Sequence, residues 1–362
     1  MKIRSLLPFT KCRRGGLSVL LAALSLTAVL AGCSGKTETP TAATAETAAA
    51  ETTGTASTVP TIIPEDVTIR VGSLKGPTSM GLVHLMDLSE QGTAGNNYEF
   101  TMFTAADELL AKIAVKDLDI ALVPANIASV LYNKTQAITV IDINTLGVLD
   151  IVASDDSIKS IADLKGKTLY LTGKGTTPEY VINYLLAANG LTTDDVSLEF
   201  KSEATEVAVI LKEQPDSIGL LPQPFVTAAC AQNENLKIVL DLTKEWQAVQ
   251  GAQGSQLVTG VTVVRKEFLE ENPNAIALFL QEHLASSDFA NANVDETAEL
   301  IARLGIVEKA AIAKKALPYC NITCITGEPM REALSGYLGV LAEQAPASIG
   351  GQLPDDGFYF LP

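Results

Sequence analysis

Short apolar runs alternate with longer amphipathic segments along most of the chain after residue 65. Runs of β-branched, aromatic and other apolar residues predict strands at residues 67–72, 98–103, 119–123 and 138–143. Helical patterns follow the first three of these strands, at residues 80–88, 105–115 and 126–132. Repeated strand, loop and helix units of this size predict an α/β fold with mainly parallel sheets.

The same alternation restarts at residue 158, with strands predicted at residues 167–171, 197–201, 218–221 and 237–240. Residues 266–346 have a largely helical pattern. Two apolar strands, at residues 146–153 and 259–264, bracket this second unit and fit a pair of crossover strands. We therefore predict two lobes: lobe I from residues 66–146 and 265–362, and an inserted lobe II from residues 147–264 that includes the hinge strands.

The N-terminus combines a basic stretch with an apolar one. Residues 1–32 contain five Lys and Arg residues and no acidic residue, and residues 15–30 carry no charge. This order is typical of a secretory signal, and the apolar run is too short for a good membrane span. The run ends in Leu30-Ala31-Gly32-Cys33, so the chain resembles a bacterial lipoprotein. The resemblance implies cleavage before Cys33, a lipid on that cysteine and a place on the extracytoplasmic face of the cell membrane; an ordinary secreted protein is the alternative.

Composition predicts a tether after the signal and limits the classes of partner that the chain can bind. Residues 33–65 are mostly Thr, Ala, Glu, Ser and Pro, which predicts a disordered tether after the lipidated cysteine. The chain has a formal net charge of −16, and removal of the basic signal makes the remainder more acidic still. Such a surface argues against binding to nucleic acid or to anionic lipid through charge, and we expect a monomer.

Cysteine and histidine are sparse. Beyond the N-terminal region only Cys230, Cys320 and Cys324 remain, and the sequence leaves open whether Cys320 and Cys324, expected four residues apart on a helix, form a disulfide. His84 and His283 are the only histidines, and neither stands near a Cys pair with ligand spacing, so we expect no metal site. No Ser-His-Asp motif is readable. We therefore predict no catalytic residues, no cofactor and no enzyme activity.

Two loops have the composition of ligand-binding turns. Gly76-Pro77-Thr78-Ser79 follows the first strand of lobe I, and residues 173–177 follow the first strand of lobe II. Glycine lets a ligand approach the backbone, hydroxyl groups donate hydrogen bonds, and the free N–H groups of a following helix attract anions. In open α/β sheets, ligands sit beyond the carboxyl ends of the strands, where both loops are expected. Ordinary helix capping is the alternative explanation for residues 176–179. Residues 173–177 do not match the motif of a nucleotide phosphate-binding loop, because the first Gly of that motif and its four-residue spacer are missing.

Several phrases resemble a known family. They are residues 71–78 (VGSLKGPT), 119–126 (DIALVPAN), 163–168 (DLKGKT) and 221–224 (LPQP). The layout is similar to type II periplasmic binding proteins, the solute receptors of ABC importers, within the nitrate/sulfonate/taurine and thiamine-precursor group. The resemblance covers nearly everything from residue 67 to residue 346. It implies a two-lobed fold in which each lobe is a mainly parallel sheet flanked by helices, joined by two crossover strands.

The resemblance also implies where a solute is held. Contacts are expected from loops of both lobes and from the floor of the cleft, at Gly76, Pro77, Thr78, Ser79, Met80, Pro124, Ala125, Asn126, Thr145, Gly147, Gly173, Lys174, Gly175, Thr176, Thr177, Gln223 and Pro224. The family often has Glu where Gln223 stands, and the neutral amide favours an anionic or neutral solute over a cationic amine.

Other side chains have two readings. Lys75 and Lys174 either steer an anion or are solvated surface lysines. Trp246, the only tryptophan, either stacks on a ligand or anchors the packing, and packing is the preferred reading. The same alternatives apply to Tyr132 and Tyr180, and His84 is expected on a helix face.

The resemblance predicts a lipid-anchored solute-binding protein that closes on a small anionic or polar heteroaromatic solute and delivers it to an ABC permease and its ATPase. Two alternatives stay open: an enzyme of the same fold that acts on a small carboxylate or a pyrimidine, and a ligand-sensing partner of a membrane receptor. The sequence does not say which solute is bound or which permease is served. Sulfonates, small carboxylates and thiamine-like pyrimidines are all compatible with it.

Overall fold

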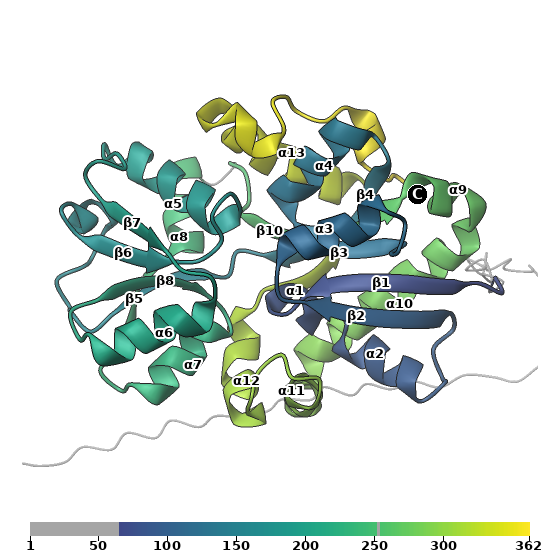
Figure 1. Cartoon of the computed structure of the whole chain (residues 1–362), viewed down its shortest axis with the longest axis horizontal. Coiled ribbons are helices and arrows are strands. Elements are labelled where there is room, and N and C mark those ends of the chain that lie inside the picture. The colour runs from purple at the N-terminus through teal and green to yellow at the C-terminus, as the bar shows by residue number, and fades with distance from the viewer. Residues whose placement is uncertain (1–64, 252–253) are drawn as a thin grey trace, which may run out of the picture. The chain divides into compact units, whose positions relative to one another are not determined.

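The computed structural model describes residues 65–251 and 254–362, which form two sheets flanked by helices (Figure 1). The predicted signal (residues 1–32), the lipid site at Cys33 and the predicted tether up to residue 64 lie outside the described residues. Among the described residues, no helix has the length and apolar character needed to cross a membrane. The predicted α/β class with two sheets is confirmed.

The first sheet has six strands in the order β11-β4-β10-β3-β1-β2. Their bounds are β1 Thr68–Leu74, β2 Asn97–Phe103, β3 Ile120–Pro124, β4 Ile138–Leu146, β10 Val258–Arg265 and β11 Ile322–Ile325. β1 pairs in parallel with β2 and β3, whereas β10 runs antiparallel to both β3 and β4. The sheet is therefore parallel except at β10 and β11.

The second sheet has five strands in the order β7-β6-β8-β5-β9. Their bounds are β5 Leu149–Ala153, β6 Thr168–Leu171, β7 Ser197–Phe200, β8 Ile218–Pro222 and β9 Lys237–Asp241. β6 pairs in parallel with β7 and β8, and β5 is antiparallel to β8 and β9. In both sheets the parallel strands align their carboxyl ends at one edge.

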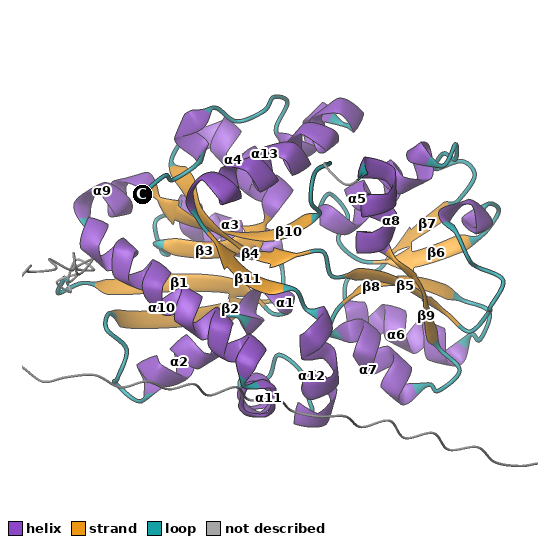
Figure 2. Ribbon diagram, turned by 180° about the vertical axis from the view of Figure 1, so that it is seen from behind, coloured by secondary structure: helices purple, strands orange, loops and turns teal. Residues whose placement is uncertain are grey.

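Helices cover both faces of each sheet (Figure 2). Around the first sheet they are α1 Pro77–Met80, α2 Val83–Glu90, α3 Ala106–Ala114, α4 Ala125–Thr135, α9 Lys266–Glu271, α10 Pro273–Ala292, α11 Val294–Arg303, α12 Ala310–Ala316 and α13 Gly327–Gln344. Around the second they are α5 Thr177–Ala188, α6 Ala204–Glu213, α7 Phe225–Gln232 and α8 Leu242–Gln250. Alternate strand residues point to opposite layers: Ile120 and Leu122 pack toward α2 and α10, and Ala121 and Val123 toward α4 and α13.

The crossover differs from the sequence prediction in one strand. Residues 146–153 form not one strand but the end of β4 and all of β5, separated by Gly147 and Val148. β10 pairs with β3 and β4 along its length, so it belongs to the first sheet and not to the second lobe. The apolar pattern of residues 259–264 identified the strand, but a pattern does not say which neighbours a strand pairs with.

The segment of residues 266–346 is helical apart from one short strand, β11, which was not predicted. Cys324 lies on that strand and Cys320 precedes it, so the expected placement of both cysteines on one helix is wrong. Cys230, Cys320 and Cys324 are all free thiols in the described part of the chain. A four-residue strand is too short to produce an alternation that sequence analysis can recognise.

Candidate functional site

Three predicted site residues, Thr78, Pro124 and Thr145, surround Gly260 at the carboxyl-end edge of the first sheet. Gly260 on β10 lies opposite Pro124 on β3 and Thr145 on β4. A Cβ added at Gly260 would lie 2.6 Å from Cγ2 of Thr78 and 2.5 Å from Oδ1 of Asn144. The close packing at this point therefore requires glycine, and it brings the β1–α1 loop onto the ends of β3 and β4.

The hydroxyl groups of the β1–α1 loop are held by the loop itself. Thr78 Oγ1 and Ser79 Oγ donate to the Leu74 carbonyl oxygen, at 3.2 and 2.6 Å. Gly76 has a φ of +152° and is buried, Pro77 begins α1, and Met80 packs in an apolar cluster with α11 and α12. The loop is thus an ordered wall in which the predicted hydroxyl donors are already in use.

The β6–α5 loop is shaped by glycines and closed by Glu179. Gly173 and Gly175 have φ values of +78° and +74°, a region that favours glycine. Thr176 Oγ1 donates to the Gly173 carbonyl at 2.8 Å, and the Gly175 N–H donates to the Glu179 carboxylate at 2.5 Å. The exposed Lys174 extends over the Phe200 ring, with its Nζ 5.8 Å from the ring centroid. This placement favours the surface reading of Lys174 over anion binding.

Asn126 joins the two halves. It stands in the first turn of α4, next to Ala125, and its Nδ2 donates to the Gly175 carbonyl at 3.1 Å. The same nitrogen donates to the Ser348 carbonyl at 3.2 Å, in the 3₁₀ turn Pro346–Ile349 that follows α13. The residues after β3 and the β6–α5 loop, which were both expected to contact a solute, are therefore in direct contact with each other.

Polar atoms without partners gather around this contact. Four side-chain atoms are buried and have no hydrogen-bond partner among the described residues: Asn126 Oδ1, Thr177 Oγ1, Tyr337 Oη and Ser348 Oγ. Their side chains are at most 2% exposed. Burial raises the pKa of Tyr337, and the Thr177 hydroxyl opposes part of that rise, so these two hydroxyls lie close together across the two halves. Unpaired buried polar groups are uncommon in native proteins, and an ordered water or a bound polar molecule is one explanation for them.

Gln223 and Pro224 lie at the carboxyl end of β8, joined by a cis peptide bond. Both ends of the Gln223 amide are bonded: Nε2 donates to Asp150 Oδ2 at 3.2 Å, and Oε1 accepts from Thr227 Oγ1 at 2.8 Å. Burial, followed by the nearby Asp241 carboxylate, raises the pKa of Asp150 to about 7. Gln223 therefore links β8 to the strand that follows the crossover, and these bonds use only one of the two N–H groups of its amide.

The remaining candidates serve packing. Gly147 lies beneath α8, where an added Cβ would meet Thr243 Oγ1 at 2.3 Å. Trp246 is buried between the Tyr184 ring at 4.7 Å and the Tyr337 ring at 5.6 Å. His84 stacks on Phe289, and Tyr132 donates to Asp355. These positions favour the packing reading of each aromatic side chain.

Two cavities of about 410 and 420 Å³ lie elsewhere on the molecule. The first is lined by residues of α3, α4 and α9, including Glu270, together with Lys116 after α3. The second is lined by residues at the amino ends of β6 and β8, including Lys167 and Asp216. None of the predicted site residues lines either cavity.

Known proteins share the overall fold of this chain. A family model described as NMT1/THI5 like matches residues 133–297. An ABC transporter protein from Parabacteroides distasonis superimposes with a TM-score of 0.68 at 23% identity, over 82% of this chain and 99% of that one. The aliphatic sulphonate binding protein SsuA from Escherichia coli gives a TM-score of 0.66 at 16% identity, over 82% and 92%. The chain has the periplasmic-binding-protein fold.

A curated relative matches part of the chain in sequence. A protein of Brucella abortus strain 2308, named as a binding protein, is 25% identical over 209 residues, which are 56% of this chain. The match spans 62% of that relative's length. The predicted resemblance to type II periplasmic binding proteins of the sulfonate and thiamine-precursor group is confirmed at the level of fold and family-model match.

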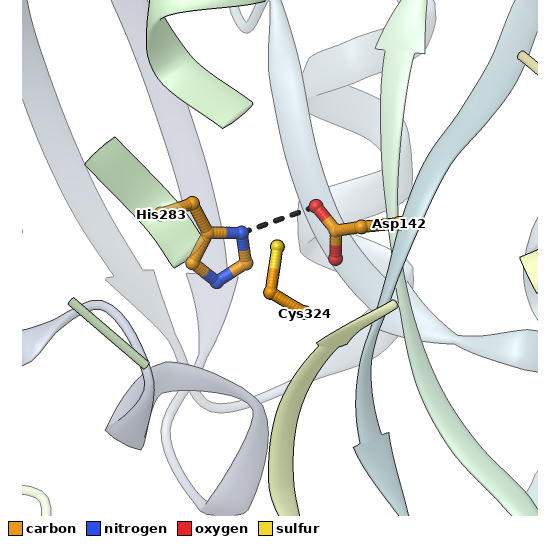
Figure 3. Close-up of side chains that lie close together, drawn as sticks. All are labelled: Asp142, His283 and Cys324. Atoms are coloured by element: carbon orange, nitrogen blue, oxygen red, sulfur yellow. Dashed lines mark hydrogen bonds and ion pairs between the residues drawn. The ribbon is translucent and has the colours of Figure 1, made fainter. Parts of the chain in front are cut away.

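Sequence analysis did not identify several residues that the structure brings together at or near the candidate site. Gly260 interrupts a β-branched run, a pattern that indicates close approach to a strand and was available as a signal. Tyr337 and Ser348 had no local signal. The cluster of Asp142, His283 and Cys324 (Figure 3) also had no local signal, because its members are far apart in the sequence.

Proposed function

We propose that the chain is an extracytoplasmic solute-binding protein that holds a small polar solute between its two sheets and delivers it to an ABC permease and its ATPase. The names of similar proteins support this proposal, since they include a binding protein and sulfonate-binding components of transporters. The main structural support for the proposal is the group of four buried polar atoms without partners, on Asn126, Thr177, Tyr337 and Ser348, which come from both halves. A solute seated on them would satisfy groups that the protein alone leaves unpaired.

The chemistry of these atoms narrows the solute class. Three are hydroxyls, which donate and accept, and the fourth is an amide oxygen, which accepts. All four belong to uncharged side chains. We therefore expect a small solute that carries both acceptors and an N–H or O–H donor. Tyr337 also belongs to an aromatic cluster with Trp246, which favours a polar heteroaromatic solute over a simple sulfonate.

Capture requires contacts from both halves. A ligand shifts an opening and closing equilibrium only by its preference for one form. We propose two lobes, residues 66–146 with 258–362 and residues 147–257, which rotate about the segment between β4 and β5. Asn126, which contacts Gly175 in this structure, would then link the lobes in the closed form.

Lipid attachment at Cys33 is a second part of the proposal. The motif Leu30-Ala31-Gly32-Cys33 supports it. Labelling of cells with a fatty-acid analogue should mark the wild-type protein and leave Cys33→Ala unmarked. Equal labelling of both proteins would contradict lipidation at this residue.

The solute is identified by a thermal-shift screen of the purified full chain against sulfonates, small carboxylates and pyrimidines, with native mass spectrometry to detect a co-purified ligand. A solute at about 100 times its dissociation constant adds roughly 2.7 kcal/mol to the free energy of unfolding, a shift that is readily measured. Recovery of the solute unchanged supports a receptor, whereas its conversion would identify an enzyme. The absence of a shift from all three classes would contradict the proposed solute chemistry.

Asn126→Ala tests the site itself. It should weaken solute binding at least tenfold by removing the contact between the halves and one acceptor. Asn189→Ala is the matched control, because Asn189 is an exposed asparagine that bonds only within α5. Equal affinity of the two variants would contradict the assignment of the site.

A further inference from the structure

Three metal-ligand side chains meet inside the first half of the molecule (Figure 3). Asp142 comes from β4, His283 from α10 and Cys324 from β11, and their ligand atoms all lie within 4.8 Å of one another. His283 Nδ1 is 3.1 Å from Asp142 Oδ2. In Figure 3 the Cys324 sulfur points into the space beside this pair. We propose that Asp142, His283 and Cys324 form a binding site for a divalent cation of the zinc class.

The spacing fits such an ion. Zinc binds nitrogen and oxygen at about 2.0–2.2 Å, so two ligand atoms at a tetrahedral angle lie about 3.3 Å apart. The distance between His283 Nδ1 and Asp142 Oδ2 is close to that value. A thiolate at about 2.3 Å from the ion would lie about 3.5 Å from the other two ligands. Closing the site therefore needs at most a small inward movement of the Cys324 sulfur. Such a movement is feasible because Cys324 is only partly buried and lies on the short edge strand β11.

The charges also fit. Asp142 and His283 are fully buried, and among the described residues Asp142 has no Lys or Arg partner. A carboxylate, a thiolate and a neutral imidazole together carry two negative charges, which a divalent cation neutralises. The thiolate is the form of cysteine that binds a metal, so binding at Cys324 would release the thiol proton.

The donor set selects among cations. Sulfur and imidazole ligands favour zinc and similar transition metals, whereas magnesium and calcium prefer oxygen. Three protein ligands leave a fourth position for water or another small ligand.

The surroundings supply the second layer of contacts that metal ligands use. Asp142 Oδ1 accepts from Thr262 Oγ1 at 2.7 Å, which fixes the carboxylate. The other ring nitrogen of His283 is buried without a hydrogen-bond partner among the described residues. This nitrogen and Ser287 Oγ both border Gly81, where an added Cβ would be 3.7 Å from the nitrogen and 3.0 Å from the oxygen. A metal on Nδ1 would place the ring proton on Nε2.

A bound cation would cross-link β4, β11 and α10. β11 pairs with β4 at only two positions, and the three ligands tie β4, β11 and α10 together. From Thr262 the hydrogen bonds continue through Asn144 to Thr145 at the edge of the candidate solute site. The metal proposal does not rest on the proposed solute, because none of the three ligands belongs to the candidate solute site.

The simplest competing reading is a hydrogen-bonded Asp–His pair with a neighbouring thiol and no metal. Metal content separates the two readings. The purified full chain is stripped with a chelator, dialysed and titrated with Zn²⁺, with the bound metal measured by mass spectrometry. We expect one Zn²⁺ per chain and a higher thermal midpoint with Zn²⁺ than with Mg²⁺. Substitution by Co²⁺ should give the thiolate-to-cobalt charge-transfer absorption and the strong visible bands of a tetrahedral site.

Variants assign the ligands. Cys324→Ser should abolish the charge-transfer band and weaken Zn²⁺ binding at least tenfold, and His283→Gln should weaken it similarly. Cys230→Ser is the matched control, because Cys230 is also a free and partly buried thiol but lies on α7. If His283→Gln does not fold, Cys324→Ser decides, since its side chain changes by one atom. No stoichiometric Zn²⁺ in the wild type, or unchanged binding in Cys324→Ser, would overturn the proposal.

Discussion

Single residues at the carboxyl-end edge of the first sheet are constrained by lack of space as much as by polarity. Gly260 shows this most directly, because an added Cβ would collide with the Asn144 amide oxygen and with the Thr78 methyl group. The position is surrounded by the ends of β3 and β4, whose backbones cannot move apart without breaking sheet hydrogen bonds. The wall of the candidate site therefore depends on one glycine.

We expect Gly260→Ala to lower the free energy of unfolding by about 1–3 kcal/mol, because one methyl group must fit into a fully packed strand contact. It should also displace Thr78 and weaken solute binding. Gly339→Ala is the control: no atom lies within 4 Å of the added Cβ, and alanine favours the helix by roughly 0.5–1 kcal/mol. Urea denaturation measures both, and equal stability of the two variants would contradict this account.

Asp150 is the buried carboxyl with the clearest consequence for pH. In an unfolded chain its pKa is about 3.9, whereas burial and Asp241 raise it to about 7 in the folded protein. Between these values the folded state keeps a proton that the unfolded state has released. The contribution of Asp150 to stability therefore falls as pH rises from about 4 to 7 and is constant above that range.

Asp150→Asn should remove this dependence and raise the free energy of unfolding at pH 8 by roughly 1–4 kcal/mol, since one pKa unit corresponds to about 1.4 kcal/mol. The asparagine oxygen can still accept from Gln223 Nε2. Denaturation curves of variant and wild type at pH 5 and about pH 8 test this. A constant difference between the two proteins across that range would show that Asp150 does not carry the pH dependence.

At the scale of elements, one ion cluster fastens three neighbouring strands. Asp119 precedes β3 and is 1% exposed; its Oδ1 accepts from Arg70 of β1 and Arg265 of β10, both at 2.7 Å. Burial raises the pKa of Asp119, but the hydrogen bonds from both arginines outweigh it, and the net pKa lies below its usual value. The stabilisation is therefore present above the unfolded pKa and is lost as pH falls through the folded one.

We expect Asp119→Asn to cost about 2–4 kcal/mol of stability at neutral pH, because two arginines lose their buried partner. Lys116→Ala, which removes the exposed pair with Glu267, should cost less than about 1 kcal/mol. Thermal denaturation at pH 7 measures the difference. A similar cost for both variants would contradict the role of Asp119.

At the scale of the whole described region, the two sheets share one apolar cluster. It joins strands of both sheets with α5, α8 and α13, and Trp246 contacts Tyr337 across the two halves. Because Trp246 is the only tryptophan, its fluorescence reports on this junction. The shared core predicts that both halves unfold together.

Urea unfolding followed by Trp246 fluorescence and by far-UV circular dichroism should therefore give coincident curves. Tyr337→Ala should lower stability by about 3–5 kcal/mol by opening a cavity in this core. Tyr337→Phe is its control: it keeps the ring and removes only a hydroxyl that lies close to Thr177, so the cost should be at most about 1.5 kcal/mol. Separate transitions for the two probes in the wild type would contradict a single cooperative unit.

Local patterns predicted most of the framework. The strands β1 to β9 and the loops after β1, β3 and β6 follow from alternation and from glycine, proline and hydroxyl residues at element ends. The short strand β11 was missed, and with it the environment of Cys324. The roles of Gln223 and Trp246 needed the fold, because the same residue types serve binding and packing equally well.

The sequence by itself determined the α/β class, the two-sheet organisation and the loops at the ends of the strands, because hydrophobic period and turn chemistry act over a few neighbouring residues. Only the tertiary structure decided the sheet to which β10 belongs, the meeting of Asn126, Thr177, Tyr337 and Ser348, and the convergence of Asp142, His283 and Cys324. These outcomes depend on contacts between segments more than a hundred residues apart. Such contacts are set by how the helices and sheets pack, and no local pattern encodes them.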